Sequence, residues 1–482
     1  MVVRRFAACV IGTALALPLC AAVYDVGEGQ RYESIGAVPW ELLAPGDTVR
    51  IHWRPEPYKE KWVIGRQGKE DAPITVQGVP GPDGQLPVID GSGATTRREL
   101  NYWNEQRGLV KIGGSNNPPD SMPRHIIIEN LEFRSARPPY SFTAANGALR
   151  AYVNNAASIY VEKGEHITIR NTVLRDSGNG LFIGSPSAEP SRNFLIERNH
   201  ILENGNAGSL FEHNSYTAAI GIVFQYNRFG ALRSGAQGNN LKDRSAGLVV
   251  RYNWIEGGNR QLDLVDGEDS SLIAADPGYR ETHVYGNVLI EPAGDGNRQI
   301  IHYGGDSGNT AQYRKGILHA YHNTIVSTRT DRTTLVRLSS NDETARFTNN
   351  IFYVSAAGNT LSLVDATGRL ELSHNWFKPG FAATFSTLAG QILDDKTSMV
   401  GDSPGFRNET EQDFRLVEGS AAINAGAAPG EDVHPLPWQY VKHLDAEERP
   451  SDERLDLGAF EYAPPAILPL LPHPLARLWP LR

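Results

Sequence analysis

Cysteine is almost missing from this chain of 482 residues, which contains only Cys9 and Cys20. Both lie in the first 22 residues, a segment with the features of an export signal that is removed after translocation. The remaining chain then has no disulfide and no thiol chemistry. Its stability must therefore come from the size of its buried core.

Long apolar runs are also scarce, since the chain has a single run, from Phe6 to Leu19, which follows two arginines. Residues 1–22 are predicted to be a signal peptide cleaved near Ala22. Acylation of Cys20 is the alternative, but Leu19 stands where lipoprotein signals have a small residue. The run is too short to span a bilayer, and no other segment is long enough. We predict an exported protein, periplasmic or secreted.

Positive charge is in short supply, with 46 Lys and Arg against 55 Asp and Glu and a formal net charge of −9. Loss of the signal peptide, with its two arginines and no acid, changes this to −11. The balance argues against nucleic acid as a partner. An anionic polysaccharide fits if the basic residues gather locally. We expect a monomer with such a polysaccharide as its partner.

What the sequence does contain is a repeat of short alternating runs that share an Asn two residues before a large apolar side chain. Alternation predicts strands with one buried face, and regular return predicts stacked coils. An Asn at a bend tolerates left-handed backbone and can form an amide ladder with an Asn stacked above it. These asparagines, 25 to 36 residues apart, are Asn171, Asn199, Asn227, Asn253, Asn287, Asn323, Asn350 and Asn375.

The repeat predicts an all-β protein, a single-stranded right-handed parallel β-helix over residues 23–462. Unequal intervals indicate loops on some coils, and such loops usually carry the binding surface of a solenoid. A β-sandwich or a propeller is the alternative. Propeller blades, however, need four strands per repeat, which these intervals cannot hold.

Both ends of the predicted stack have sequences that fit capping roles, which open strand edges require. Residues 40–49 read as a short N-terminal capping helix that is stopped by Pro45 and Gly46. Segments that start at Asp413, Ala422 and Asp456 follow the last regular coil and are expected to cap the other end. Residues 463–482 are rich in Pro and Leu and are expected to form a loosely held tail.

The Pro-Gly-Asp-Thr-Val sequence at 45–49, the Asn-containing coils and the Asp-Leu-Gly-Ala-Phe-Glu-Tyr sequence at 456–462 resemble bacterial exported β-helix proteins of the pectate-lyase-like superfamily. The resemblance covers nearly the whole mature chain and implies the fold. It does not imply one reaction, because that superfamily includes lyases, hydrolases, esterases, epimerases and non-catalytic proteins.

A narrower resemblance involves Glu212-His-Asn-Ser-Tyr216, Asn239-Asn-Leu-Lys-Asp-Arg244 and Leu262-Asp-Leu-Val-Asp-Gly267. These segments are similar to those of exported β-helix proteins described as polysaccharide-degrading enzymes. The Lys and Arg also resemble polysaccharide lyases of family six, which act on alginate and dermatan, without a residue-by-residue match. The Gly-His-Gly and Arg-Ile-Lys segments of polygalacturonase-type hydrolases are missing from the sequence.

Residues that lie at the same distance in sequence from the Asn of their own coil are expected to stack on one another. This count predicts two neighbouring columns of polar side chains, with about 4.8 Å between successive coils. The first contains His213, Lys242, Glu268 and His302, and the second contains Tyr216 and Arg244. Such columns would form a groove along the helix axis whose step is close to the length of one sugar unit.

Cleavage of a uronic-acid glycan by β-elimination needs a neutralised carboxylate, removal of the neighbouring proton and protonation of the leaving oxygen. We assign Arg244 as the neutralising group, and its charge would help Lys242 act as a neutral base. Tyr216 or His213 would be the acid, and the acid and base roles are exchangeable. Each of the four also has a structural reading, as an ion-pair partner, a turn histidine or a packing residue.

Charge along the coils suggests where substrate and metal would bind. Residues 228–260 contain six bases and two acids, which predicts a local cationic strip. The predicted substrate-binding residues are Asn214, Asn240, Arg251, Arg260, His302 and Tyr303. The acids that follow would bind Ca²⁺ through their oxygens, or would remain a solvated face. These acids are Asp263, Asp266, Glu268 and Asp269.

Histidines give a different expectation for transition metals. His302, His319 and His322 lie on different coils without the spacing of a zinc site, so no such site is expected.

The function favoured by these residues is a polysaccharide lyase. A glycoside hydrolase that uses two of the four acids is the first alternative. A non-catalytic glycan-binding or envelope scaffold protein is the second.

Overall fold

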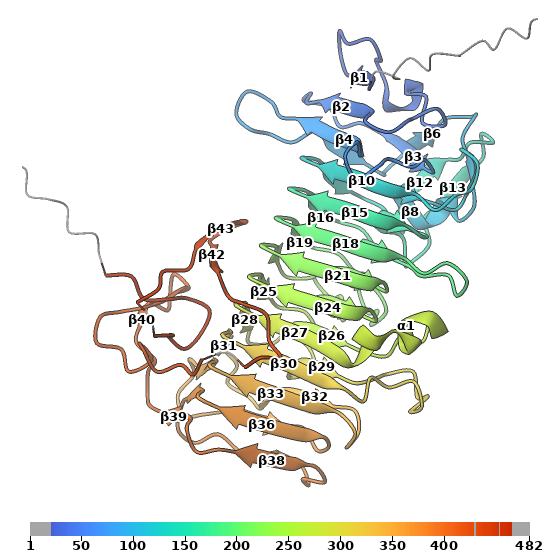
Figure 1. Ribbon diagram of the computed structural model, residues 1–482. Helices are drawn as coiled ribbons and strands as arrows, with labels where there is room; N and C mark the ends of the chain where they lie inside the picture. Colours follow the sequence, from blue (N-terminus) through green and yellow to red (C-terminus); the bar gives the residue numbers. More distant parts are fainter. Residues whose placement is uncertain (1–20, 429, 453, 465–482) are drawn as a thin grey trace, which may run out of the picture.

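The computed structural model describes residues 21–428, 430–452 and 454–464. The predicted signal peptide and tail fall almost entirely outside these residues. Three long sheets run along one axis, and each turn of the chain adds a strand to each sheet in succession (Figure 1). The predicted right-handed parallel β-helix is therefore confirmed. Within the described residues, no helix is long and apolar enough to cross a membrane.

Sheet 1 has 13 strands, and its neighbours are parallel. Its inward positions are filled by Ile, Val, Leu and Phe from successive coils, which form one continuous core. The strands are β1 (Val23–Val26), β2 (Thr48–His52), β4 (Ile74–Val79), β10 (Arg124–Glu129), β15 (Glu165–Arg170), β18 (Arg192–Glu197), β21 (Ile220–Gln225), β24 (Ala246–Arg251), β27 (Glu281–Tyr285), β30 (Ile317–Tyr321), β33 (Thr344–Thr348), β36 (Arg369–Ser373) and β38 (Gln391–Asp394).

Sheet 2 has 11 short strands, which follow sheet 1 after a two-residue bend in most coils. They are β5 (Val88–Asp90), β11 (Glu132–Arg134), β16 (Val173–Arg175), β19 (His200–Leu202), β22 (Arg228–Phe229), β25 (Trp254–Glu256), β28 (Val288–Glu291), β31 (Thr324–Ser327), β34 (Ile351–Val354), β37 (Trp376–Phe377) and β39 (Met399–Val400).

Sheet 3 closes each coil and has 13 strands. They are β3 (Glu60–Ile64), β6 (Ala94–Thr96), β8 (Gly108–Ile112), β12 (Ser141–Thr143), β13 (Leu149–Ala151), β14 (Ala157–Val161), β17 (Asn179–Ile183), β20 (Ser215–Thr217), β23 (Leu241–Asp243), β26 (Leu262–Leu264), β29 (Gln299–Tyr303), β32 (Thr333–Leu338) and β35 (Leu361–Val364). Helix α1 (Ser271–Ala275) and the 3-10 helix η3 (Pro277–Arg280) lie in the loop between β26 and β27.

The repeated asparagines form an interior ladder at the bend between sheets 1 and 2. From Asn199 to Asn350, each side-chain amide donates at 2.9 to 3.0 Å to the side-chain oxygen of the next Asn, and the ladder ends at Asn375. Left-handed backbone falls on the preceding residue, such as Tyr252, rather than on the ladder Asn. Asn171 occupies that left-handed position, so its expected place in the ladder is wrong and Thr172 takes it.

The N-terminal cap differs from the sequence prediction. The short helix at this end is the 3-10 helix η1 (Ile35–Ala37), whereas residues 40–42 form a turn. Pro45 and Gly46 form a second turn before β2 begins at Thr48. The apolar residues expected for the helix still cap the core, since Trp40 is fully buried and stacks on Trp62 with ring centroids 5.3 Å apart.

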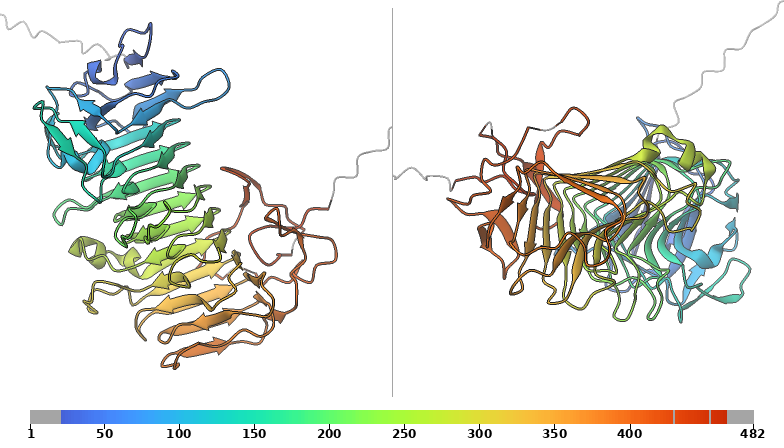
Figure 2. Two further views of the ribbon diagram at one scale, coloured as in Figure 1. Left: turned by 180° about the vertical axis from the view of Figure 1, so that it is seen from behind. Right: turned by 90° about the horizontal axis from the view of Figure 1, so that it is seen from below.

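The C-terminal segment packs along the side of the stack rather than on its end (Figure 2). It contains the hairpins β40 (Phe406–Asn408) with β41 (Asp413–Leu416) and β42 (Trp438–Val441) with β43 (Asp445–Glu448). Phe414, Leu416 and Tyr440 pack on outward apolar residues of sheet 2 such as Trp254 and Ile351. The three segments predicted to cap the end instead cover this lateral face.

Candidate active site

The candidate site lies on the outward face of sheet 3, where the strand register aligns side chains from successive coils. Tyr216, Lys242, Asp263 and His302 occupy one column, each paired with the next across adjacent parallel strands. The predicted alignments of Tyr216 with Arg244 and of His213 with Lys242 are therefore wrong by two and three residues. The prediction assumed that each coil has the same number of residues between its Asn and its sheet 3 strand, whereas the turns before these strands differ in length.

Lys242 is held between two carboxylates and is largely buried. Its Nζ lies 3.0 Å from Asp263 Oδ2 and also forms an ion pair with Asp306. The expected role of Lys242 as a base rested on its closeness to the Arg244 cation, whereas its direct contacts are with two acids.

Arg244 connects the rest of the site. Its Nε donates to the phenolic oxygen of Tyr216 at 2.9 Å. Its Nη2 lies 2.8 Å from Asp306 Oδ1 and 2.7 Å from Glu268 Oε1. The Tyr216 hydroxyl in turn donates to Asp269 at 3.4 Å. Burial raises the pKa of Tyr216, and the Arg244 guanidinium opposes that rise.

A groove of about 770 Å³ opens over these groups. An adjoining hollow of about 810 Å³ shares Phe211 and Tyr216 with it, so the two form one channel along several coils. The adjoining part has an aromatic floor, because Phe182 lies between Tyr160 and Tyr216 with ring centroids at 4.8 and 5.3 Å. Such faces stack on the apolar faces of sugars and exclude water.

His213 lines the groove but is not suited to the acid role. Its Nδ1 accepts a hydrogen bond from the backbone N–H of Asn239 at 2.8 Å. Burial and then Lys242 lower the pKa of His213 to about 3, so the ring is neutral at ordinary pH.

Asp263 is an internal anchor rather than a metal ligand. Its carboxylate accepts hydrogen bonds from Lys242, from Asn239 at 2.7 Å and from His302 at 2.7 Å. Arg260, which lines the groove, approaches it at 3.4 Å. Burial alone would raise the pKa of Asp263, but these partners hold it well below the usual range.

The calcium site predicted from Asp263, Asp266, Glu268 and Asp269 does not form. In residues 21–464, positions 429 and 453 aside, the ligand atoms of these four side chains do not come together as a cluster that could hold a metal ion. Asp266 is buried and accepts from the backbone N–H groups of Asp306 and Ser307. Glu268 is paired with Arg244. The four acids thus support the surrounding chain at separate points.

Several residues predicted to bind substrate lie elsewhere. Asn214 and Asn240 are fully buried and form a second amide ladder, with 2.6 Å between them. Tyr303 points into the core, because it follows the outward His302 on a strand. Arg251 lies on sheet 1, where it contacts Gln225 and Tyr285. These four assignments are wrong, whereas Arg260 lines the groove.

His302 lies in the polar column beneath the groove rim. Its two ring nitrogens contact Asp263 and the Ser339 hydroxyl, the latter at 2.9 Å, and 2% of the residue is exposed. Both ring nitrogens of His302 therefore have partners within the protein, and its place among the substrate-binding residues stays a prediction.

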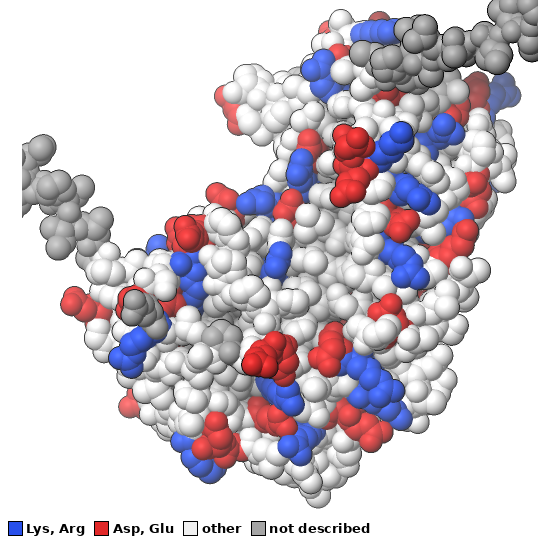
Figure 3. Space-filling model, viewed as in Figure 1, with Lys and Arg blue, Asp and Glu red and all other residues white. Residues whose placement is uncertain are grey.

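The predicted cationic strip is also absent from the described groove. Three bases and three acids line the part around Lys242. Arg228 belongs to sheet 2, and Arg233 pairs with Asp176 at a loop. The face seen in Figure 3 likewise intersperses acids and bases. Because each coil passes through three sheets, basic residues that are close in the sequence lie on different faces of the stack.

Asp306 is the site residue that the sequence interpretation missed. It comes from the loop after β29, two coils beyond Arg244, and it contacts both Lys242 and Arg244. No motif marks it, because a loop of this length folds back by an unpredictable path. Its neighbour Ser307, however, donates to the buried Asp266, which fixes the loop there.

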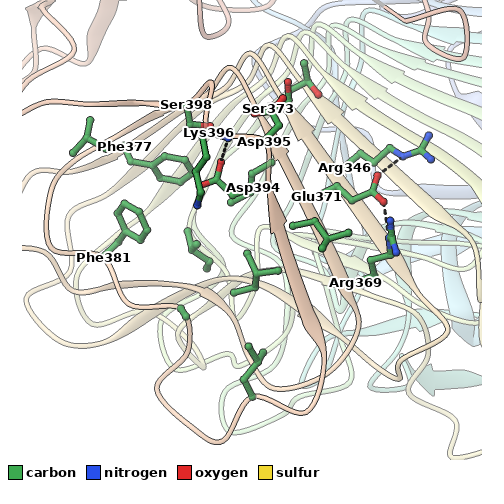
Figure 4. A pocket seen from close by; sticks show the side chains of 18 residues that line it. Arg346, Arg369, Glu371, Ser373, Phe377, Phe381, Asp394, Asp395, Lys396 and Ser398 are labelled. Atoms are coloured by element: carbon green, nitrogen blue, oxygen red, sulfur yellow. Dashed lines mark hydrogen bonds and ion pairs between the residues drawn. The ribbon is translucent and has the colours of Figure 1, made fainter.

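A second hollow, of about 870 Å³, lies at the C-terminal end of the stack (Figure 4). Its floor is apolar and includes Leu372 and Phe377, core residues of the last coils. The charged groups on its rim are paired with each other, as Lys396 is with Asp394 at 3.0 Å. This hollow is the open end of the core, and it lacks the convergent polar groups of the sheet 3 groove.

Comparison with known proteins agrees with this architecture. A family model described as a right handed beta helix region matches residues 88–289. The structure resembles pectate lyase Pel9A, with a TM-score of 0.54 and 14% identity over 92% of this chain and 96% of that one.

Two further solved structures resemble it less. An alginate lyase from Paenibacillus sp. str. FPU-7 gives a TM-score of 0.44 and 14% identity over 67% of this chain and 93% of that one. A rhamnogalacturonan lyase gives a TM-score of 0.44 and 11% identity over 74% of this chain and 87% of that one. A search of curated proteins found no match. The chain is a right-handed parallel β-helix protein that shares its fold with pectate lyase Pel9A, as the sequence resemblance implied.

Proposed function

We propose that this protein is a polysaccharide lyase that cleaves a uronic-acid-containing glycan in the sheet 3 groove. One observation carries the proposal: Lys242 and Arg244 together hold the carboxylate of Asp306. Two cations that clamp one carboxylate at the floor of a groove are arranged to bind the carboxylate of a uronate. Asp306 occupies the position that the substrate carboxylate would take.

The elimination consumes no water. A base removes the proton beside the carboxyl carbon, the bond from the ring to the glycosidic oxygen breaks, and a ring double bond forms. The leaving oxygen takes a proton from an acid. Arg244 would stabilise the negative charge that develops on the substrate carboxylate, because its guanidinium already forms two carboxylate contacts.

The contacts favour an exchange of the two proton-transfer roles expected from the sequence. Lys242 forms ion pairs with Asp263 and Asp306, and a lysine in such pairs has protons to donate to the leaving oxygen. Tyr216 accepts a hydrogen bond from Arg244, and this cation would stabilise the phenolate that takes up the substrate proton if Tyr216 acts as the base. The aromatic floor beyond Tyr216 would bind neighbouring sugar units.

A glycoside hydrolase is the second candidate, because one specific geometry favours it. Glu268 and Asp306 contact the same nitrogen of Arg244, so their contacting oxygens are at most about 5.5 Å apart, a limit that includes the carboxylate spacing of retaining glycosidases. Burial raises the pKa of Glu268, whereas Lys242 and Arg244 lower that of Asp306. A raised pKa suits the general acid of a glycosidase, and a lowered pKa suits its nucleophile.

The substitution Asp306→Asn separates the two functions. In a lyase it removes an internal competitor for the substrate carboxylate, so KM for the polymer should fall roughly three- to tenfold, within the 1.4 kcal/mol that a tenfold change represents. In a hydrolase it removes a reacting carboxylate, so kcat should fall by about 10²-fold or more. Initial rates of product formation against polymer concentration measure both quantities.

Asp342→Asn is the matched control. Asp342 is an exposed acid that pairs with Lys315 away from the groove, and this substitution should change neither constant. A collapse of kcat in Asp306→Asn with an unchanged control would contradict the lyase proposal and support the hydrolase.

A further inference from the structure

A second cluster of chemically competent side chains lies on sheet 1, on a different face from the groove. Glu281 and His283 are two residues apart on β27, so both side chains point outward. His319 on the adjacent strand β30 pairs in register with His283. One ligand atom from each of the three side chains lies within 4.8 Å of the other two.

The contacts within this cluster leave donor atoms available. His319 Nε2 lies 2.8 Å from Glu281 Oε2. The rings of His283 and His319 are stacked at 4.8 Å with an interplanar angle of 9°. His283 Nδ1 is buried and has no hydrogen-bond partner among the described residues. A buried nitrogen without a hydrogen-bond partner costs free energy, and a metal ion bound by the cluster that contains it would offset this cost.

The C-terminal segment brings a fourth imidazole to the same place. The ring of His434 lies edge-on to His283 at 4.3 Å. Its backbone is fixed, because the N–H and the carbonyl of His434 both bond the Tyr321 hydroxyl, at 3.0 and 3.1 Å. Arg346 and Asp432, which pair at 2.8 Å, complete the charged surroundings.

We propose that Glu281, His283 and His319 form a binding site for a divalent transition-metal ion of the zinc type, with its fourth position open toward His434. Two imidazoles and one carboxylate are a ligand set that zinc accepts in proteins. Ligand bonds of about 2.0–2.2 Å require a modest closing of the three side chains, which the half-exposed Glu281 carboxylate can make. This site is independent of the proposed lyase activity.

Titration calorimetry of untagged, chelator-treated full-length protein with Zn²⁺, followed by Co²⁺ absorption spectra, tests the site. We expect one equivalent of Zn²⁺ and the intense visible bands of low-coordinate Co²⁺. Both His283→Ala and Glu281→Gln should weaken binding by roughly 100-fold or more, since even loss of outer-shell partners costs 10–100-fold. Glu281 is exposed, so its substitution tests the site without disturbing the core.

The stacked pair His125 and His166 provides the control. Its rings lie 4.7 Å apart on β10 and β15 of the same sheet, and among the described residues no third side chain completes a set of ligand atoms within 4.8 Å of one another. His166→Ala should leave Zn²⁺ affinity unchanged. Absence of Zn²⁺ binding, or equal binding by wild type, His283→Ala and Glu281→Gln, would overturn the proposal.

Discussion

Lys242→Ala is expected to lower kcat on a uronate polymer by about 10³-fold, within the range for loss of a proton-transfer group. Lys242 also contributes to the carboxylate clamp, so KM should rise as well. The protein should still fold. Asp263 keeps Asn239, His302 and Arg260 as partners, and Asp306 keeps Arg244. Steady-state kinetics with circular dichroism of the purified variant measure both effects.

Two further variants sharpen this test. Lys242→Arg retains a cation for the clamp but donates a proton poorly, so it should bind polymer with a nearly normal KM and still lose most of kcat. Lys396→Ala removes an exposed lysine that lies at the far end of the stack and should have no effect. Full activity of Lys242→Ala would remove Lys242 from the reaction.

Asn253→Ala is expected to lower the free energy of unfolding by about 3–5 kcal/mol, because it leaves several buried polar groups without partners. The Asn253 amide donates to Phe224 O, Arg251 O and Asn287 Oδ1. Its side-chain oxygen accepts from the backbone and side-chain nitrogens of Asn227. Denaturant unfolding, followed by circular dichroism, measures the loss.

Asn146→Ala is a suitable control for the ladder substitution. Asn146 is exposed, and its side chain accepts one local hydrogen bond from Ala148 N. The control should change stability by less than about 0.5 kcal/mol. A loss below about 1 kcal/mol in Asn253→Ala would contradict the view that the amide ladder is a main stabilising element of the coils.

The fold could be predicted from the sequence because every coil repeats the same local pattern of residues. Alternation, the bend and the Asn ladder all point to one stack. The register of sheet 3 was not predictable from the Asn count. Each coil reaches that sheet through a bend of its own length, and an error of two residues moved Arg244 out of the column that holds Tyr216.

Other errors follow from physical rules that local sequence does contain. His302 and Tyr303 are neighbours on a strand, so both could not face the groove. Asn214 and Asn240 recur at one position in successive coils, which is the pattern of an interior ladder. Asp306 carries no such signal. Its place beside Lys242 and Arg244 depends on the path of a loop and on the buried Asp266 that anchors it.

The candidate metal cluster illustrates a limit of spacing rules. Ligands on a parallel β-helix need only be two residues apart on one strand and in register on the next coil. Glu281, His283 and His319 meet both conditions, although the sequence separation of 36 residues between the two histidines resembles no zinc motif.

The central claim is that the sheet 3 groove cleaves a uronate glycan by elimination. The most direct measurement is mass spectrometry of early products formed from alginate, pectate and glycosaminoglycans in water enriched in heavy oxygen. Elimination predicts unsaturated products that absorb ultraviolet light and carry no heavy oxygen at the new ends, and Lys242→Ala should form them about 10³-fold more slowly. Heavy oxygen at the new reducing ends would identify a hydrolase, and polymer binding without new ends would identify a binding protein. Either result would contradict the account.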